Sequence, residues 1–405
     1  MNVTAPSDES LLELLADLVR INSVNPNYEG GVTEAAMADF VEQYFQRIGV
    51  ETWRQIVYPD RPNVIARIPG LDPSRRIVFE AHLDTVSTVG MTIPPWTPDI
   101  RDGKMYGRGA CDTKGGMAAM MHALASLVHQ GYTPACDVLF AATIDEEYSY
   151  RGVVALCDSL DPGPVDPIIL ETEVPPRNPL RAEAAIIAEP TGLEAVIASK
   201  GLVRWKIETR GKAAHSAKPH LGNNAIEQMA HVIRAIEADN LRLAKLAHPL
   251  LGPATCNIGV IRGGVQINFV PDRCEIEIDR RLLPGETREG VLAEYQQLLD
   301  RLAADHPAMD AVMHPPMLSD RPLETDVNSA AVKTLRQVLE SLGHPAEPIG
   351  VPFCSDASKF GALGIPSMIL GPGSIDQAHA AVEFIECEQV IACAEIYRQF
   401  VLQFK

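Results

Sequence analysis

The order of apolar patterns along this chain restricts its fold more than any other feature. Short apolar runs of strand length alternate with stretches in which apolar residues recur at helical spacing. The strand-length runs cover residues 63–68, 77–81, 138–144, 185–188 and 367–370, and helical patterns cover residues 11–19, 35–47 and 117–128. This alternation predicts an α/β fold, with a mostly parallel sheet covered by helices on both faces.

The pattern changes between about residue 194 and residue 315. Residues 203–209 and 274–279 alternate apolar with polar side chains, as half-exposed antiparallel strands do, and each run precedes a helical pattern. An order of strand, helix, strand, strand, helix and strand predicts an α+β, ferredoxin-like domain inserted into the first one. We therefore expect one domain of residues 1–193 and 316–405 and an inserted domain of residues 194–315. The chain, at 405 residues, is long enough for both.

Composition and charge argue against nucleic-acid and membrane partners. Acidic residues outnumber basic ones by 53 to 35, the formal net charge is −18, and no cluster of lysine and arginine occurs. A nucleic-acid site needs such a basic patch. No apolar stretch reaches membrane-spanning length, and acidic residues interrupt the first helical pattern, unlike a secretory signal. We expect a cytoplasmic protein.

The eight cysteines are scattered without a Cys-x-x-Cys pair. This spacing is typical of reduced thiols in a cytosolic protein. A catalytic thiol is the alternative, and Cys111 and Cys354 lie nearest the candidate site described next. Buried small hydrophobic side chains nevertheless explain the cysteines better. Any metal ion is then held by nitrogen and oxygen ligands.

Histidines and acidic residues follow several of the predicted strands. Carboxyl ends of parallel strands meet at one edge of a sheet, where side chains distant in sequence converge. Imidazole and carboxylate groups hold zinc and hard divalent cations, and a hydrolytic site leaves one carboxylate free to act on water. A single such residue is usually a solvated charge or a satisfied histidine. Together they predict a metallohydrolase, with the candidates His82, Asp84, Asp112, Glu146, Glu147, Glu189 and His379.

Longer motifs around these residues carry a family resemblance. The chain has EAHLDTV at 80–86, YGRGACDTKGG at 106–116, DEE at 145–147 and IAEPT at 187–191. It resembles, over nearly its whole length, the acetylornithine deacetylase, succinyl-diaminopimelate desuccinylase and carboxypeptidase G family of dinuclear zinc amidohydrolases. LGPGSIDQAH at 370–379, together with HPP at 314–316, is similar to the acetylornithine deacetylase branch. The resemblance implies a catalytic zinc-hydrolase domain and an inserted lid or dimerisation domain.

The resemblance also implies a role for each candidate. Two divalent metal ions are expected, zinc first, with cobalt or manganese also compatible with nitrogen and oxygen ligands. Asp112 would bridge the two ions, with His82 and Glu189 completing one and Glu147 and His379 completing the other. Glu146 would be the general base, and Asp84 would orient His82. Neighbours on a regular strand point to opposite faces, so Glu146 and Glu147 should lie in a turn.

The remaining expected residues bind substrate. His215 resembles the family histidine that stabilises the oxyanion in the other subunit's active site, which implies a homodimer. Asn268 and Arg281 match positions that bind the substrate carbonyl and carboxylate, for which the planar guanidinium is well suited. Arg280 is the alternative to Arg281, because strand alternation lets only one of the two face the site. Backbone N–H groups at Gly371 and Gly373 could approach substrate, since glycine has no Cβ.

Departures from the family pattern leave the substrate open. Leu83 replaces the usual threonine, the stretch from Asp161 to Pro179 is a long predicted loop, and residues 353–357 read FCSDA where YCTEA is expected. We expect hydrolysis of an N-acyl amino acid, with acetylornithine deacetylase first and succinyl-diaminopimelate desuccinylase, dipeptidase or carboxypeptidase as alternatives. A binding or regulatory protein on the same fold is the alternative of a different class. The intact ligand set and Glu146 argue against it.

Overall fold

The computed structural model describes residues 6–160 and 182–405, and the predicted loop at 161–179 lies outside them. The chain divides into two compact units. One comprises Met1–Ile197, Thr325–Ile349 and Ser355–Lys405, and the other comprises Ala198–Glu324 and Gly350–Cys354. The assignment of catalysis to the first unit and of a lid or dimer contact to the second stays a prediction.

The first unit is built on a mixed sheet with a parallel centre. Strands β6, β3, β7 and β20 are parallel neighbours, and β1, β2 and β8 flank them in antiparallel pairings. The order in the sheet is β1 (Glu51–Tyr58), β2 (Arg61–Ile68), β6 (Cys136–Thr143), β3 (Asp72–His82), β7 (Ala184–Ile187), β20 (Ser367–Ile369) and β8 (Val196–Ser199). The expected parallel sheet is confirmed at its centre, where nearly every residue is buried, as strands covered on both faces must be.

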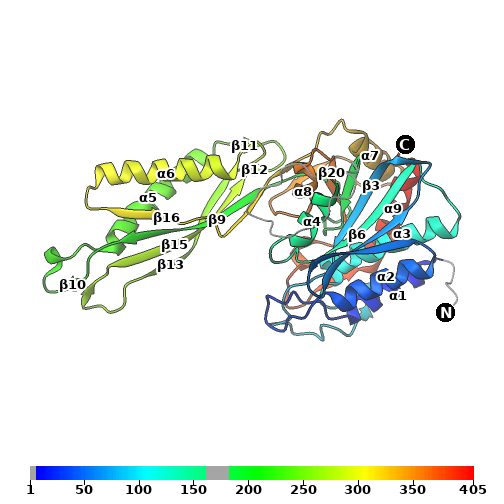
Figure 1. The fold of residues 1–405 in the computed structure, drawn as a ribbon, viewed down its shortest axis with the longest axis horizontal. Coiled ribbons are helices and arrows are strands. Elements are labelled where there is room, and N and C mark those ends of the chain that lie inside the picture. The colour runs from blue at the N-terminus through cyan, green and yellow to red at the C-terminus, as the bar shows by residue number, and fades with distance from the viewer. Residues whose placement is uncertain (1–5, 161–181) are drawn as a thin grey trace. The chain divides into compact units, whose positions relative to one another are not determined.

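Helices cover both faces of this sheet (Figure 1). One face packs against α1 (Asp8–Arg20), α2 (Ala35–Arg47), α3 (Gly115–His129), α7 (Ala330–Leu342) and α9 (Cys387–Gln403). There the ring of Phe140 lies 5.1 Å from Phe45 of α2, and that of Phe79 lies 5.6 Å from Tyr397 of α9. The other face carries α4 (Arg151–Leu160) and α8 (Ala357–Ala362), and Asn63 donates from Nδ2 to the Gly152 carbonyl oxygen at 2.8 Å.

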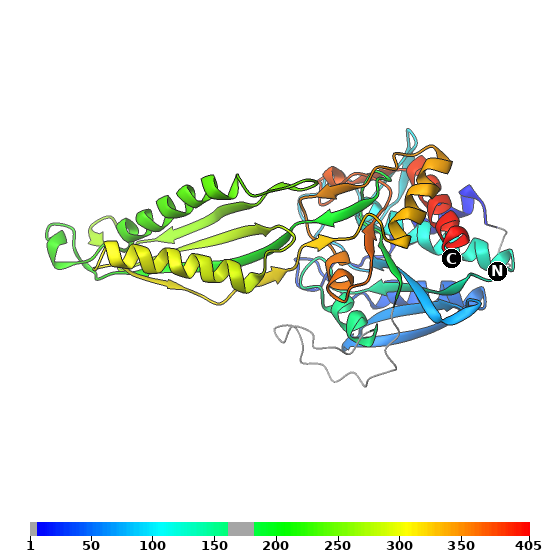
Figure 2. The same cartoon turned by 90° about the horizontal axis from the view of Figure 1, so that it is seen from above.

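The second unit contains an antiparallel sheet with two helices on one face (Figures 1 and 2). The strands lie in the order β13 (Thr255–Gly263), β15 (Arg273–Leu282), β9 (Gly201–Arg210) and β16 (Asp310–Met313), with β17 (Leu318–Asp320) also paired to β9. Helices α5 (Ala225–Leu243) and α6 (Arg288–Asp305) run side by side and bury Met229 and Tyr295 against Trp205 and Ile276. The expected α+β order is confirmed, and β15 alternates buried with partly exposed residues as predicted.

Short elements complete the described chain. A small antiparallel sheet joins β4 (Asp99–Arg101), β5 (Lys104–Tyr106) and β21 (Phe384–Glu386). The others are η1 (Ala110–Lys114), β10 (Ala214–His215), η2 (Pro219–Leu221), β11 (Ala247–His248), β12 (Gly252–Pro253), β14 (Phe269–Val270), β18 (Leu323–Glu324), β19 (Ile349–Val351) and η3 (Ile375–Gln377). Across residues 6–160 and 182–405, every helix is too short or too polar to traverse a bilayer.

Candidate metal centre

Three of the five predicted metal ligands, His82, Glu147 and Glu189, lie at the carboxyl ends of neighbouring parallel strands, while Asp112 lies in η1 and His379 follows η3. His82 is the last residue of β3, and Glu189 follows β7 by two residues. Glu146 and Glu147 follow β6 in a turn, which confirms the expected departure from strand geometry. The turn begins at Asp145, whose positive φ of 67° lies in the left-handed region that aspartate tolerates in turns. Because β6, β3 and β7 are adjacent, all these side chains reach the same edge of the sheet.

Asp112 lies between two histidines that come from distant parts of the sequence. Its Oδ1 is 3.1 Å from His82 Nε2, and its Oδ2 is 3.3 Å from His379 Nε2. Glu189 Oε1 lies 3.9 Å from His82 Nε2, and Glu147 Oε2 lies 3.1 Å from His379 Nε2. The structure therefore groups one histidine and one glutamate at each oxygen of Asp112, which is the arrangement that a bridging carboxylate needs.

The donor set fits divalent cations. Ligand atoms lie within 4.8 Å of one another in two groups that share His82, one with Asp112 and Glu147 and the other with Glu146 and Glu189. Glu147 Oε1 is buried and has no hydrogen-bond partner among the described residues. A buried oxygen without a donor is costly, and a coordinated cation would satisfy it. The sulfur-free set of imidazole and carboxylate groups agrees with the predicted nitrogen and oxygen ligation.

The carboxylates of the centre repel one another strongly. Burial, reinforced by the charge of Asp112, raises the pKa of Glu189 to about 8 and that of Glu147 to about 7. Burial alone would raise the pKa of Asp112 as well, but its hydrogen bonds with the two histidines hold that pKa below its usual range. Hydrogen bonds with Asp112 and Glu147 raise the pKa of His379 to about 10. The protein thus concentrates negative charge that protons or metal cations must neutralise.

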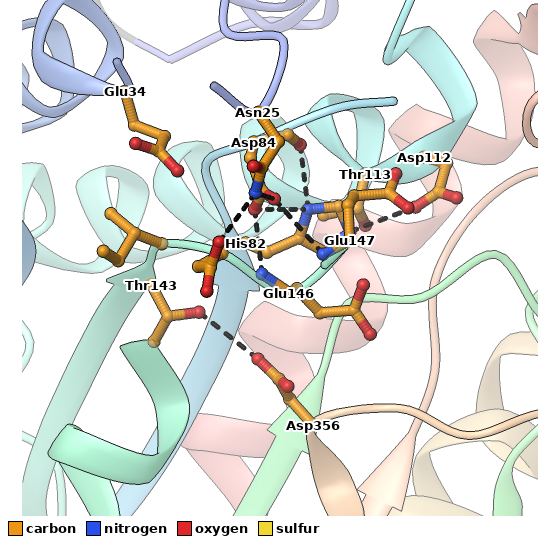
Figure 3. Close-up of polar contacts among 12 residues, drawn as sticks. Asn25, Glu34, His82, Asp84, Asp112, Thr113, Thr143, Glu146, Glu147 and Asp356 are labelled. Atoms are coloured by element: carbon orange, nitrogen blue, oxygen red, sulfur yellow. Dashed lines mark hydrogen bonds and ion pairs between the residues drawn. The ribbon is translucent and has the colours of Figure 1, made fainter. Parts of the chain in front are cut away.

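Asp84 supports the centre in two ways, through its backbone and through its side chain. The ring nitrogen Nδ1 of His82 lies 3.0 Å from the Asp84 carbonyl oxygen, whereas the nearer carboxylate oxygen is 3.7 Å away. The carboxylate instead accepts the backbone N–H groups of Glu146 and Glu147, at 3.1 and 3.2 Å (Figure 3). The expected orientation of His82 is therefore assigned mainly to the Asp84 carbonyl, and the carboxylate holds the turn that carries both glutamates.

A buried polar network behind the turn was not expected from the sequence. Asn25 donates from Nδ2 to Asp84 Oδ2 at 2.8 Å and to Asp145 Oδ1 at 2.9 Å. Arg61 donates to the same Asp145 oxygen at 2.9 Å and forms a bidentate pair with Glu34 at 2.6 and 2.7 Å. These residues come from separate segments and share no spacing or motif. Only their buried polar character in apolar surroundings could have drawn attention to them.

Another buried contact lies on the sheet face away from α9. Thr143 donates from its hydroxyl to Glu80 Oε1 at 2.5 Å. The same hydroxyl lies 3.4 Å from Asp356 Oδ2 (Figure 3). Burial and the charge of Asp356 raise the pKa of Glu80 well above its usual range. Glu80 and Asp356 thus lie close together near the metal centre, and neither was marked by a motif role in the sequence.

Gly371 and Gly373 pack closely against the metal centre. The N–H of Gly371 donates to Thr191 Oγ1 at 3.2 Å, and that of Gly373 donates to Gln389 Oε1 at 2.8 Å. A Cβ on Gly373, whose φ is +84°, would lie 2.6 Å from Cys111 Sγ. Close packing therefore explains the need for glycine here. A substrate contact through these N–H groups stays a prediction. It requires each N–H group to give up its present acceptor and donate to substrate instead.

Cys111 has the properties of a structural side chain. It is buried, its thiol donates to the Ser374 carbonyl oxygen at 3.3 Å, and burial raises its pKa well above the usual range. A nucleophilic cysteine needs the opposite shift. The geometry therefore favours the buried-hydrophobe interpretation over a catalytic thiol.

The other predicted substrate residues belong to the second unit. His215 is exposed on β10, and its Nδ1 accepts the Ala217 N–H at 3.1 Å. Asn268 is exposed, and its backbone carbonyl oxygen accepts the Ser216 N–H at 3.0 Å. Arg281 keeps 27% of its side chain exposed and pairs with Asp279 at 2.8 Å, while Arg280 is completely buried against Glu286. Of the two arginines, only Arg281 is exposed to solvent. Its role, like those of His215 and Asn268, stays a prediction.

Comparisons with known proteins show which enzymes this chain is similar to. A succinyl-diaminopimelate desuccinylase, described as probable, from Staphylococcus aureus strain N315 is 26% identical over 99% of each chain. Acetylornithine deacetylase from Myxococcus xanthus is 31% identical, over 91% of this chain and 92% of its own. Among the solved structures that share the fold are two from species of Bacillus. Aminopeptidase PepT of Bacillus cereus has a TM-score of 0.79 at 22% identity over 99% of both chains. A dinuclear metal binding peptidase of Bacillus subtilis has a TM-score of 0.70 at 15% identity over 98% and 97%.

A profile of peptidase family M20/M25/M40 matches residues 78–403, which include every predicted metal ligand. The match extends over most of the chain, and the Myxococcus relative passes 30% identity over nearly all of it. This chain therefore belongs to peptidase family M20/M25/M40 and is a hydrolytic enzyme.

Proposed function

We propose that this enzyme is a dinuclear-metal amidohydrolase that removes the acyl group from an N-acyl amino acid with a free carboxylate. The observation that carries the proposal is Asp112 between two histidine and glutamate pairs, with Glu146 beside them as an additional carboxylate. The names of the relatives, a deacetylase and a desuccinylase, support the same class of substrate. Acetylornithine deacetylation is our first choice, and desuccinylation or dipeptide hydrolysis is the second.

Five residues of the first unit would hold the metal ions. Asp112 would contribute one oxygen to each ion, and the remaining ligands would be His82, Glu189, Glu147 and His379. When bound, the two ions, zinc first and cobalt or manganese as alternatives, would polarise the amide carbonyl and acidify water. The Asp84 carbonyl keeps the Nδ1 proton of His82 in place, which leaves Nε2 of that ring as the free lone pair.

Glu146 is the general base of the proposed reaction. It lies with His82 and Glu189 in one of the two ligand groups. Of the acidic residues in these two groups, Glu146 is the only one that is neither Asp112 nor a member of a histidine and glutamate pair at Asp112. It is therefore the carboxylate left free of metal in this proposal. Its carboxylate accepts a proton from the attacking water, whose oxygen bonds to the carbonyl carbon of the substrate. The carbon–nitrogen bond then breaks, and Glu146 passes the proton to the leaving amine nitrogen. Burial, with the charge of Glu189, raises its pKa well above the usual range, and bound cations would oppose that rise by stabilising the ionised carboxylate.

Residues of the second unit would bind the substrate and a second copy of the chain. Arg281 offers its guanidinium to the substrate carboxylate, Asn268 binds the carbonyl, and His215 stabilises the oxyanion across a homodimer.

Strand β13 is an unpaired sheet edge among the described strands of its unit. Val265 and Ile267, which follow β13, are 91% and 99% exposed. Exposed apolar side chains beside a free strand edge support the homodimer. We also propose a cytoplasmic location, on the cysteine pattern.

The test is amine release from N-acetylornithine, N-succinyl-diaminopimelate and dipeptides, using zinc-loaded protein and a chelated control. Fast, chelator-sensitive release from one N-acyl amino acid would support the deacylase proposal and identify the acyl group. No amine release from any substrate of the panel, with two metal ions bound, would instead favour a binding role.

Glu146→Gln should lower kcat about 10²- to 10⁴-fold with the metal retained. Glu29→Gln, at an exposed position, is the matched control. Full turnover by Glu146→Gln would contradict the mechanism.

A further inference from the structure

Glu383 is a completely buried carboxylate four residues after His379, and the proposed reaction does not use it. Its Oε1 accepts the backbone N–H groups of Cys111 and Asp112 at 2.9 and 3.1 Å. Its Oε2 accepts the Gly109 N–H at 3.0 Å and Arg108 Nη1 at 2.8 Å. Four donors occupy the two oxygens, which is the full complement that a carboxylate accepts. Glu383 is therefore saturated by protein donors and is not a metal ligand itself.

Strand pairing explains why Glu383 meets this loop. In the small sheet, Phe384 of β21 pairs with Tyr106 of β5, so the next residues outward are Glu383 and Gly107. The Gly107 N–H accordingly donates to the Glu383 carbonyl oxygen at 3.2 Å. Gly109 has a φ of +77°, and a Cβ there would lie 2.7 Å from Thr85 Cγ2. The loop that leads into Asp112 is thus closely confined, with Glu383 as its main acceptor.

Arg108 extends this contact to a third ligand-bearing segment. While Nη1 binds Glu383, Nη2 donates to the Ser87 carbonyl oxygen at 2.9 Å, three residues beyond Asp84. The pair therefore joins the segment after His82, the loop to Asp112 and the segment after His379. Both side chains are buried, so water cannot replace either partner.

We infer that Glu383 is a positioning residue that fixes Asp112 between the two histidines and thereby sets metal affinity. The inference rests on the proposed metal-dependent function. Without the carboxylate, three backbone N–H groups next to Asp112 lose their acceptor, and the loop must shift to find new ones. Residues that hold metal ligands in place typically change metal affinity 10- to 100-fold when they are replaced.

The experiment measures cobalt(II) affinity by chelator competition and the visible spectrum of the cobalt-loaded protein. In Glu383→Gln, the amide NH₂ faces N–H donors, so we expect at least about tenfold weaker binding and an altered spectrum. Glu386→Gln, three residues on, is the matched control, because the ion pair of Glu386 with Lys104 is loose, at 3.8 Å. The control should bind cobalt as the wild type does. A purely structural role for Glu383 would lower thermal stability yet leave the affinity and spectrum of the folded protein unchanged.

Glu383→Asp provides the second variant if the glutamine protein does not fold. Aspartate keeps the charge opposite Arg108 but is shorter by one methylene, so it cannot reach all four donors. We expect folded protein with cobalt affinity lowered about threefold or more. Wild-type affinity and spectrum in a folded Glu383 variant would overturn the inference alone. Wild-type protein that binds no cobalt would overturn the proposed function, and the inference with it.

Discussion

Replacing Asp84 by asparagine separates the two tasks that the structure gives this residue. The carboxylate accepts three donors, the N–H groups of Glu146 and Glu147 and the amide of Asn25. Asparagine has one acceptor oxygen. In the more favourable orientation of the new side-chain amide, its oxygen still accepts the Glu147 N–H and the Asn25 amide. Its NH₂ group then faces the Glu146 N–H, which loses its acceptor. One buried donor without a partner costs about 1–3 kcal/mol. If displacement of Glu146 adds this free energy to the activation barrier of the reaction, kcat should fall between about 5- and 150-fold.

The assay pairs steady-state kinetics on the best substrate with metal affinity by chelator competition. Because His82 Nδ1 faces the Asp84 carbonyl oxygen, which the substitution retains, metal affinity should stay within about threefold of the wild type. Asp99→Asn, at an exposed position, is the control. A variant that keeps kcat but loses metal affinity about 10- to 100-fold would refute the reasoning, since it would show that the carboxylate orients His82.

Three further outcomes are expected. Arg281→Lys should raise KM about 10-fold or more with little change in kcat, because lysine cannot form the bidentate pair with a carboxylate; an unchanged KM would contradict this assignment. Ile267→Asp should give a monomer of lowered kcat in sedimentation velocity, and a fully active monomer would refute the role of His215 across a dimer. Burial raises the pKa of Asp158 to about 6, so the native state holds its proton more tightly than the unfolded state and stability falls as pH rises from about 4 to 6. Asp158→Asn should therefore gain about 1 kcal/mol at pH 7.5, allowing for partial exposure, and nothing at pH 4; an equal gain at both pH values in thermal unfolding would refute this.

The strands and the two sheet types could be predicted because hydrophobic periodicity is a local property. Residues 77–81, 138–144 and 185–188 lie in or beside the central strands β3, β6 and β7. The direction of a strand within the sheet is not local. The run at 63–68 was identified as a strand, but its antiparallel pairing with β6 depends on tertiary structure. The prediction of parallel strands therefore holds at the centre of the sheet, and the strands that flank this centre pair in the antiparallel direction.

The candidate site divides in the same way. Strand ends mark His82 and Glu189 in the sequence, because the fold brings such ends together. Asn25, Arg61 and Glu383 act through backbone groups or through other side chains, and neither periodicity nor spacing marks such contacts. Asp84 shows the limit best. The sequence points to Asp84 as the partner of His82, but it does not reveal that the contact comes from the backbone carbonyl while the carboxylate holds the following turn.

The order of the proposed ligands along the chain has a consequence for synthesis in the cell. His82, Asp112, Glu147 and Glu189 are translated before the second unit, whereas His379 follows it. A nascent chain that includes the second unit but not residue 379 therefore carries the acidic residues with one of the two proposed imidazole ligands. If these residues bind the metal ions as proposed, tight binding requires His379 and therefore follows translation of the second unit.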